Sequence, residues 1–428
     1  MCYAIPGRVI EIQGRVAIVD YFGEKRKVLN DLVDAKVGDY VYAQGGILID
    51  KINENDALEI LAFWEKEFFN LKNRDRKLAQ FQQLSGESEI LDILQKINLK
   101  KELTKNEILK LLKVEDREAL ISIYQLANSI RQREHGNASC VHGIIEFSNY
   151  CKNNCFYCGL RRDRKIKRYR LTKEEIMQIA EYAVKEFGFK ALVLQSGEDY
   201  YYTTEEVIDI IKELSKLKIL IFLSLGIREK NEYEKFYEAG ARAYLLRFET
   251  SNKNIFNKLR PGTSFEERIE TIKFLKKIGY VIATGFLIGL PDETDEDIIN
   301  NIFLAKSFQP DMYSFSPFIP TPETPLENLN PVNEEKILKI IAITRFIDND
   351  ANILVTTAFE TLSKDAKRNG LLSGANSLMI NVTPPEYRRL YDLYPKRPMD
   401  DSKKMIKDTI NLLLELGRSP TDLGLSRI

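Results

Sequence analysis

From residue 143 onward the sequence alternates between short apolar runs and longer segments with helical periodicity. In a strand–helix–strand unit the helix returns the chain to the same edge of the sheet, so repeated units build a parallel sheet. Eight apolar runs with helices between them predict an α/β fold, a closed (β/α)8 TIM barrel. The predicted strands are GIIEFSN (143–149), ALVLQSG (191–197), ILIFLSLG (219–226), AYLLRFE (243–249), VIATGFLIGL (281–290), MYSFSPF (312–318), NILVTTA (352–358) and SLMINVTP (377–384).

One intervening helix is clearly marked. Thr172 and Glu175 form a capping box, apolar residues from 176 to 187 fall on one face, and Gly188 ends the helix. In a TIM barrel the chemistry sits at the carboxyl ends of the strands. The polar residues expected at those ends are Ser148, Ser196, Gly197, Glu198, Ser224, Arg247, Glu249, Ser316, Thr356, Thr357, Asn381 and Thr383.

The amino-terminal part follows a different pattern. Alternating runs at 8–12 and 15–19 flank Gly14 and predict a hairpin, runs at 24–29 and 39–52 continue the strands, and 53–69 reads as a helix. Thr104 and Glu107 then form a capping box for a new helix. We therefore predict a small β-domain over residues 1–70, a partly helical linker over 71–102 and the large barrel over 103–428.

Charge and hydropathy exclude several classes of protein. Lys and Arg number 63, as do Asp and Glu, so we expect no nucleic-acid partner. No apolar run approaches the roughly 18 residues of a membrane span. The opening MCYAIPGRVIEI does not read as a signal peptide, so we expect a cytoplasmic protein without a disulfide framework. The basic run at 161–170 is interpreted as a solvated face or as a loop that covers the neighbouring cysteines.

Three of the five cysteines fall within eight residues, directly after the first predicted barrel strand. Cys151, Cys155 and Cys158 form a C-x3-C-x2-C loop whose thiolates can converge on one small group. Three cysteine ligands on a 4Fe–4S cluster leave one iron open to a substrate or cofactor. One alternative is three buried cysteines without a ligand. The other is a zinc site, which needs a fourth ligand from Cys140, His135 or His142.

This loop resembles the signature of the radical S-adenosylmethionine (SAM) superfamily, Cys-x3-Cys-aromatic-x-Cys after a barrel strand. The resemblance implies that the amino and carboxylate groups of SAM chelate the open iron. It implies that one electron from the cluster breaks the C5′–S bond and that a 5′-deoxyadenosyl radical forms. It also implies an external electron donor such as a ferredoxin or flavodoxin.

Further motifs resemble the HydE family of FeFe-hydrogenase maturases and follow in the same order over residues 103–428. Biotin synthase and methylornithine synthase share only the general layout. The matching segments are FSNYCKNNCFYCGLRRD, VLQSGED, YLLRFETSN, KLRPGTSFEERIETIKFLKKIGY, GLPDET, FSPFIPTPETPL and YRRLYDLYP.

The resemblance assigns roles to single residues. Cys151, Cys155 and Cys158 are the implied cluster ligands. Tyr157 is placed near the adenine of SAM, and Gly289 lies on a glycine-rich strand beside the adenosine. The other implied SAM-site residues are Ser196, Gly197, Glu198, Arg247, Glu249 and Arg268, and the implied cavity residues are Met379, Tyr391, Thr356 and Thr357.

The opening MCYAIPGRVIEI resembles the HypC family, small chaperones of NiFe-hydrogenase maturation that form a β-barrel with a trailing helix. In that family removal of Met1 exposes the cysteine. The resemblance therefore implies that Cys2 holds an iron fragment or contacts another hydrogenase maturation protein. The alternative is a surface cysteine without a role. The sequence departs from the family at Gln44, where a histidine is common.

Three functions agree with these features. The first is radical SAM chemistry on an organometallic precursor, an Fe(CO)(CN)–cysteine complex, in hydrogenase maturation. The second is a radical SAM mutase or sulfur-inserting enzyme that acts on an amino-acid-like substrate. The third is a non-catalytic metallochaperone that binds the cluster and SAM as a scaffold.

Overall fold

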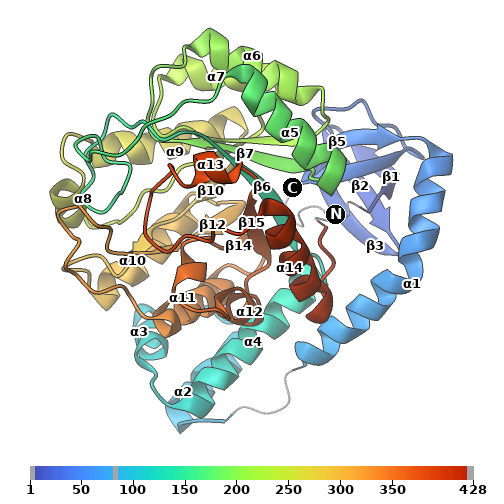
Figure 1. The fold of residues 1–428 in the computed structure, drawn as a ribbon. Helices are drawn as coiled ribbons and strands as arrows, with labels where there is room; N and C mark the ends of the chain where they lie inside the picture. Colours follow the sequence, from blue (N-terminus) through green and yellow to red (C-terminus); the bar gives the residue numbers. More distant parts are fainter. Residues whose placement is uncertain (1–4, 81–84, 422–428) are drawn as a thin grey trace.

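The structure, a computed structural model, describes residues 5–80 and 85–421. It contains two closed barrels of different size, with the helix α1 (Glu54–Leu78) leading from the small barrel along the side of the molecule (Figure 1). Among the helices of these residues, none combines the length and the apolar character needed to cross a membrane.

The large barrel has eight parallel strands in the order β10-β12-β14-β15-β6-β7-β8-β9, and the (β/α)8 prediction is confirmed. Apolar residues alternate along these strands between the barrel interior and the surrounding helices. The strands are β6 (Cys140–Ser148), β7 (Ala191–Ser196), β8 (Leu220–Ser224), β9 (Ala243–Leu245), β10 (Val281–Thr284), β12 (Met312–Ser314), β14 (Asn352–Val355) and β15 (Ser377–Asn381).

Two predicted strands are interrupted. After β10 and β12 the chain forms β11 (Leu287–Ile288) and β13 (Ser316–Pro317), which pair in a separate two-stranded sheet. The first interruption falls at Gly285, where an added Cβ would collide with the carbonyl group of Ser314. The absence of a side chain therefore allows the two strands to approach closely before they diverge.

Helices surround the large barrel (Figure 1). The capping boxes predicted at Thr104 and Thr172 are both present, and Gly188 ends its helix in the left-handed conformation. The helices are α2 (Ser88–Asn98), α3 (Lys105–Lys113), α4 (Arg117–His135), α5 (Lys173–Phe187), α6 (Thr204–Ser215), α7 (Lys230–Ala239), α8 (Lys253–Leu259), α9 (Phe265–Ile278), α10 (Asp295–Ser307), α11 (Glu334–Ile347), α12 (Ala366–Leu372), α13 (Pro385–Arg388) and α14 (Ser402–Glu415), with a 3-10 turn, η1 (Phe359–Thr361), before α12.

The small barrel has five strands in the order β1-β2-β3-β5-β4. The run predicted as one strand over 39–52 divides into two strands at Gly45 and Gly46, which both have positive φ. The strands are β1 (Gly7–Gln13), β2 (Val16–Tyr21), β3 (Glu24–Leu29), β4 (Tyr40–Gln44) and β5 (Ile47–Ile52).

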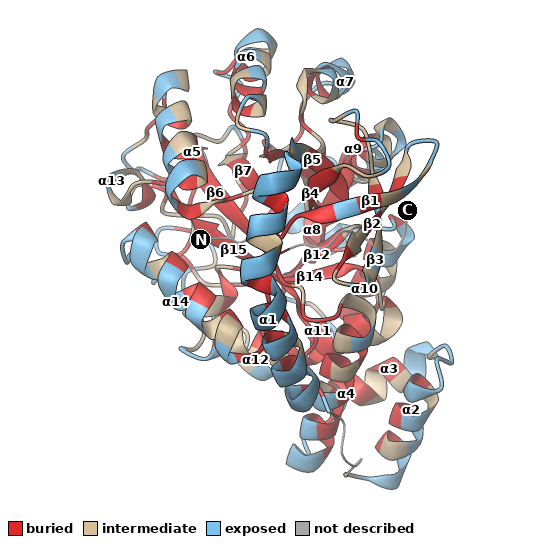
Figure 2. Cartoon of the chain, turned by 90° about the vertical axis from the view of Figure 1, so that its right-hand side faces the viewer, coloured by how far each residue is buried: buried red, intermediate tan, exposed pale blue. Residues whose placement is uncertain are grey.

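Helix α1 is longer than the helix predicted over 53–69. It continues to Leu78 because Phe68, Leu71 and Asp75 are buried against the rest of the molecule. Its outer face is exposed along most of its length (Figure 2). The polar stretch predicted as the start of a linker is therefore part of this helix.

The small barrel closes the amino-terminal end of the large one. Tyr42, Ile47 and Ile49 pack in one apolar cluster with Ala191 and Leu220, the first residues of β7 and β8. This arrangement leaves the carboxyl ends of the barrel strands for a binding site.

Candidate active site

A cavity of about 240 Å³ lies at the carboxyl end of the large barrel. This is the end at which TIM barrels place their chemistry. Residues from positions 144 to 397 meet there, including most of the predicted site. The predicted residues that line it are Cys151, Cys155, Tyr157, Cys158, Ser196, Gly197, Glu198, Arg247, Glu249, Arg268, Thr356, Thr357, Met379 and Tyr391.

The cysteine loop follows β6 and is fixed by the protein itself. Gly159 has no room for a side chain, because a Cβ would collide with the carbonyl group of Asp392. Backbone hydrogen bonds tie the loop to three other segments. The N–H of Lys152 donates to the carbonyl of Glu198, that of Phe156 to Leu259 and that of Gly159 to Leu393, each at 2.9 Å.

The thiols of Cys151 and Cys158 lie where a negative charge is disfavoured. Burial raises the pKa of Cys151 to about 11, and burial together with the charges of Cys155 and Cys151 raises the pKa of Cys158. Metal coordination reverses this effect because it deprotonates a thiol. Within residues 5–80 and 85–421, no three His, Cys, Asp or Glu side chains are already arranged around one metal position. Three thiols on the wall of one cavity nevertheless fit the donor set of a cluster held by three cysteines.

The side chains that could complete a zinc site lie elsewhere. Cys140 and His142 are near the other end of β6, where the sulfur lies 3.3 Å from His142 Nε2 and accepts a hydrogen bond from Gln44 Nε2 of the small barrel (3.1 Å). Burial lowers the pKa of His142 to about 4, so its ring is neutral. His135 contacts the carbonyl oxygen of Asn349 (3.2 Å). In the described structure none of the three lines the cavity, which disfavours zinc.

The basic run at 161–170 folds over the cysteine loop. Arg164 donates to the carbonyl of Gly159 (3.2 Å), and Arg168 donates to the carbonyls of Arg161 (2.7 Å) and Arg164 (3.2 Å). Arg161 and Arg164 are buried. Arg162, Lys165 and Lys167 are exposed, so both interpretations of this run hold in part: some of its residues pack on the cysteine loop and others face solvent.

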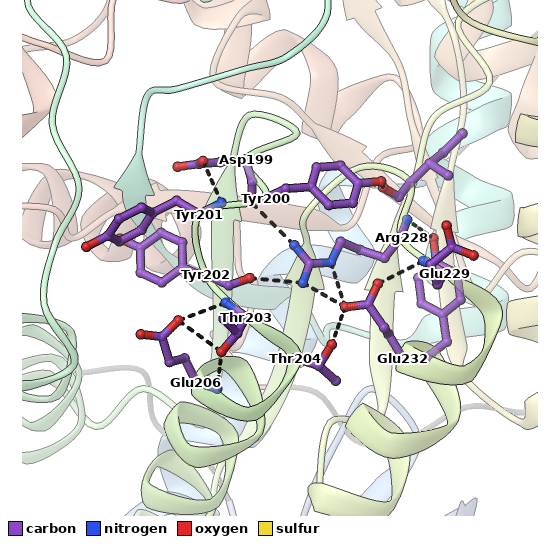
Figure 3. A network of polar contacts seen from close by, with 12 residues as sticks. Asp199, Tyr200, Tyr201, Tyr202, Thr203, Thr204, Glu206, Arg228, Glu229 and Glu232 are labelled. Carbon is purple, nitrogen blue, oxygen red and sulfur yellow. Dashed lines mark hydrogen bonds and ion pairs between the residues drawn. The ribbon is translucent and has the colours of Figure 1, made fainter.

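The segment after β7 forms the neighbouring wall and is anchored by a buried ion pair. Arg228 pairs with Glu232 of α7 (2.7 Å) and donates to the backbone carbonyls of Asp199 (3.3 Å) and Tyr202 (3.0 Å), as Figure 3 shows. Glu232 also accepts a hydrogen bond from the hydroxyl of Thr204 at the start of α6 (2.7 Å). One guanidinium thus holds the segment to two helices.

Asp199 connects this wall to the start of the cysteine loop. Its carboxylate accepts hydrogen bonds from the hydroxyl of Ser148 (2.6 Å) and from Arg170 Nε (2.8 Å). A Cβ at Gly197 would collide with the carbonyl of Tyr150 and would lie 2.7 Å from Cys151 Cβ. The predicted glycine is therefore needed for the close approach of the two loops.

Carboxylates and guanidiniums alternate along the next part of the wall. Glu198 Oε1 lies 3.4 Å from Arg268 Nη1 and 3.9 Å from Arg260 Nη2. Glu249 Oε1 lies 3.9 Å from Arg268 Nη2, and Glu249 Oε2 lies 3.5 Å from Arg247 Nε. Such a wall can bind both ends of a zwitterion.

Glu249 departs from the prediction in its backbone. The strand predicted over 243–249 would place Arg247 and Glu249 on one face, but β9 ends at Leu245 and Glu249 has a φ of 72°. A non-glycine residue in this left-handed region is strained, and such strain concentrates at ligand sites. Its Oε2 atom is buried and, apart from the 3.5 Å ion pair with Arg247 Nε, has no hydrogen bond among the described residues, so a ligand can donate to it.

Arg260 was not assigned from the sequence. Its Nη1 atom donates to the phenol oxygen of Tyr157 (2.6 Å), which orients the ring next to the last cysteine. Arg260 lies in the matched segment KLRPGTS, but no spacing rule connects it to the cysteine loop.

The wall formed by β14 and β15 lies across the barrel from β8 and β9. The hydroxyls of Thr357 and Tyr394 are 2.8 Å apart, and Gln195 Nε2 donates to the hydroxyl of Tyr391 (3.4 Å). Glu146, Tyr394 and Arg397 also line the cavity and were not assigned from the sequence. For Glu146 a signal existed, since a carboxylate interrupts the apolar run GIIEFSN.

One residue predicted beside the adenosine is not found at the cavity. Gly289 is a turn residue with a φ of 86°, and its N–H donates to Glu293 (2.7 Å); it is absent from the lining of the cavity in the described structure. Cys2 lies outside the described residues.

Three family models match the chain. The radical SAM superfamily matches residues 145–305, the HupF/HypC family matches residues 1–64, and the biotin and thiamin synthesis associated domain matches residues 314–409. The matches therefore extend over both barrels.

Individual relatives agree with these models. The FeFe hydrogenase maturase subunit HydE of Thermotoga maritima is 42% identical over 332 residues, which are 77% of this chain and 95% of the relative. The 3-methylornithine synthase of Methanosarcina acetivorans is 32% identical over 74% of this chain and 91% of the relative. The crystal structure of methylornithine synthase (PylB) superposes with a TM-score of 0.68 at 30% identity, over 77% of this chain and 97% of that chain.

Proposed function

Because the chain belongs to the HydE family of radical SAM enzymes and carries a HupF/HypC domain, we propose that it acts in hydrogenase maturation on an Fe(CO)(CN)–cysteine precursor. The HydE relative is named for maturation of FeFe hydrogenase and is matched over 95% of its length. The small domain resembles chaperones of hydrogenase maturation as well. The large barrel and the small domain thus both support a role in hydrogenase maturation.

The observation that carries the proposal is the cavity, which combines three thiols with a charged wall and, across the barrel, a hydroxyl-bearing wall. We assign Cys151, Cys155 and Cys158 as the cluster ligands. A reduced 4Fe–4S cluster with one open iron, when bound, supplies the electron that cleaves SAM. That electron comes from a small donor protein such as a ferredoxin or flavodoxin.

The chain's own residues position the cofactor and the substrate. In our proposal the Glu198–Arg268 pair and Glu249 bind the amino and carboxylate groups of SAM, and Tyr157, held by Arg260, lies near the adenine. Ile144, Leu354 and Met379 give the cavity an apolar floor, which limits the access of water to the reacting groups.

The small domain completes the proposal. We assign to Cys2 the binding of an iron fragment or the docking of another maturation protein. The thiol is a soft ligand that suits iron. The packing of this domain on the amino-terminal end of the large barrel keeps it away from the cavity.

A second candidate is a mutase-type reaction on an amino-acid-like substrate. It is favoured by the similarity to 3-methylornithine synthase, which is 32% identical over 91% of that protein. Its substrate would occupy the same cavity, so the two candidates differ in the molecule that is consumed.

One experiment separates the candidates. The full chain is purified without oxygen, reconstituted with iron and sulfide, reduced and supplied with SAM. We expect 5′-deoxyadenosine to form, and to form faster with a synthetic iron–carbonyl–cyanide–cysteine complex than with free amino acids. Stimulation by free amino acids alone would replace the proposal with the second candidate. An intact cluster that yields no 5′-deoxyadenosine would identify a scaffold instead of an enzyme.

A further inference from the structure

We propose that Glu146 recognises the substrate in this cavity by accepting a hydrogen bond from a substrate amine. The inference rests on the proposed function, which places the substrate in the cavity. It deepens that function by naming the chemical class of the bound group: an amino-acid moiety with N–H donors beside a hydrogen-bond acceptor.

Glu146 is a carboxylate inside the barrel. Side chains alternate along a strand, so Glu146 shares the inward face of β6 with Ile144, and both line the cavity. Glu146 is only 2% exposed. A carboxylate in such surroundings is costly unless it is paired and hydrogen-bonded.

The pairing of Glu146 is incomplete. Its Oε1 atom forms an ion pair with Arg397, but its Oε2 atom is buried and has no hydrogen-bond partner among the described residues. Burial raises the pKa of Glu146, while the charges of Arg397 and Arg388 and side-chain hydrogen bonding with Arg397 and Asn381 oppose this shift. Two carboxylate oxygens have about four acceptor positions, so part of the acceptor capacity of Glu146 is unused.

Arg397 is not free to turn toward the second oxygen. It also donates to the backbone carbonyl of Tyr391, and its guanidinium lies 5.3 Å from the centre of the Tyr391 ring and 5.5 Å from that of Tyr394. These contacts fix the guanidinium on Oε1. No described residue donates a hydrogen bond to Oε2, so the contents of the cavity can supply that donor.

A second polar atom on the same side of the barrel is also unpartnered. Thr356 Oγ1, at the end of β14, is buried, lines the cavity and has no hydrogen-bond partner in the described structure. β14 is separated from β6 only by β15. A carboxylate accepts and a hydroxyl both accepts and donates, so a ligand with N–H donors next to an acceptor satisfies both groups. A plain carboxylate has no N–H donor for Glu146 Oε2 and would leave that atom without a hydrogen bond.

This site is distinct from the carboxylate that we assign to SAM. Glu249, whose Oε2 atom is ion-paired with Arg247 but has no hydrogen bond in the described structure, follows β9, and β9 is separated from β6 by β7 and β8. The cavity thus offers on each side one buried carboxylate oxygen that can accept a hydrogen bond. Two amines, one of the cofactor and one of the substrate, match this arrangement.

Three thiol probes test the inference. L-Cysteine has an amine and a carboxylate, cysteamine has only the amine, and 3-mercaptopropionate has only the carboxylate. Each is titrated calorimetrically into the reconstituted full chain saturated with SAM. We expect L-cysteine and cysteamine to bind about 10–100-fold more tightly than the amine-free probe, the difference typical of a hydrogen bond to a charged group. Glu146→Gln should abolish that preference while the affinity for 3-mercaptopropionate is retained.

Glu360→Gln is the matched control. Glu360 also forms an ion pair, with Lys367 (3.0 Å), but it is not part of the lining of this cavity. We expect this variant to keep the amine preference. If Glu146→Gln does not fold, Glu146→Asp takes its place, because it keeps the charge and shortens the side chain by one methylene. The preference for amine-containing probes should fall in this variant as well.

Two outcomes would overturn the inference. An unchanged amine preference in both Glu146 variants would mean that water satisfies Oε2. If Glu146→Gln lowers the affinity for SAM as much as the affinity for L-cysteine, the carboxylate belongs to the binding site of the cofactor. An amine preference in a wild-type chain that forms no 5′-deoxyadenosine would instead reject the proposed function and keep this recognition.

Discussion

At the scale of single residues, buried cysteines with different surroundings have to be distinguished. Cys155 and Cys140 are both buried, but Cys155 lines the cavity, whereas Cys140 lies at the far end of β6 beside Gln44. We expect Cys155→Ala to lose most of its iron and its visible absorbance after reconstitution, because two thiolates hold a 4Fe–4S cluster poorly. Cys140→Ala should keep both. Full iron in Cys155→Ala, or equal losses in the two variants, would contradict the assignment.

A second residue-scale prediction concerns Glu293. Burial raises its pKa from 4.5 to about 7, although the N–H of Gly289 donates to it. Between about pH 4.5 and 7 the folded chain keeps a proton that the unfolded chain has lost, so the stability falls as the pH rises through this window. The loss is at most about 3 kcal/mol. Glu293→Gln should flatten the pH dependence of the free energy of unfolding, measured by denaturant titration. Parallel profiles for the two proteins would refute this expectation.

The residues of the site were predictable to different degrees. The cysteines are recognised by their spacing, and Glu198, Arg247 and Arg268 by segments that resemble a known family. Arg397 has no such signal, because its role depends on Glu146, which lies 251 positions earlier in the chain. A contact of this range becomes visible only once the barrel is closed.

At the scale of elements, α1 depends on one buried carboxylate. Asp75 accepts hydrogen bonds from Arg131 of α4 (2.7 and 2.8 Å) and from Arg418 (2.9 Å) after α14. Asp75→Ala leaves two buried guanidiniums uncompensated, so we expect a loss of about 3–5 kcal/mol in the free energy of unfolding. The control is Asp209→Ala, which removes an exposed ion pair with Lys173 (2.7 Å) and should cost far less, because solvent screens the pair. Similar losses in both variants would count against a structural role of Asp75.

The same residue explains why the end of α1 was missed. Residues 70–78 read as polar, and periodicity alone gives no reason to bury Asp75. The reason lies in arginines that are 56 and 343 positions away. By contrast, the eight barrel strands were predictable because each coincides with an apolar run of the sequence, even where the strand itself is short, as in β9. The capping boxes at Thr104 and Thr172 were predictable because each is contained within four residues.

At the scale of the whole molecule, the two barrels form one packed unit. The sequence predicts both barrels but not their contact, because Tyr42, Ile47 and Ile49 could equally belong to the interior of the small barrel. In the structure they cover the beginnings of β7 and β8, and Gln44 donates to Cys140 at the start of β6. The position at which the sequence departs from the HypC pattern is therefore part of the interface between the barrels.

Two glycines allow this interface to be tested. Gly45 and Gly14 have φ values of 57° and 60°, so valine introduces similar backbone strain at both. A side chain at Gly14 meets no atom within 4 Å, whereas a Cβ at Gly45 would lie 2.6 Å from Leu220 Cδ2 of β8. We expect Gly45→Val to lower the free energy of unfolding by about 1–3 kcal/mol more than Gly14→Val, the cost of overpacking a filled core. Gly45→Val should also speed proteolysis of the small barrel. Equal losses of stability in the two variants would mean that the packing between the barrels does not stabilise the molecule. The contact between Gln44 and Cys140 would then not couple the small barrel to the large one.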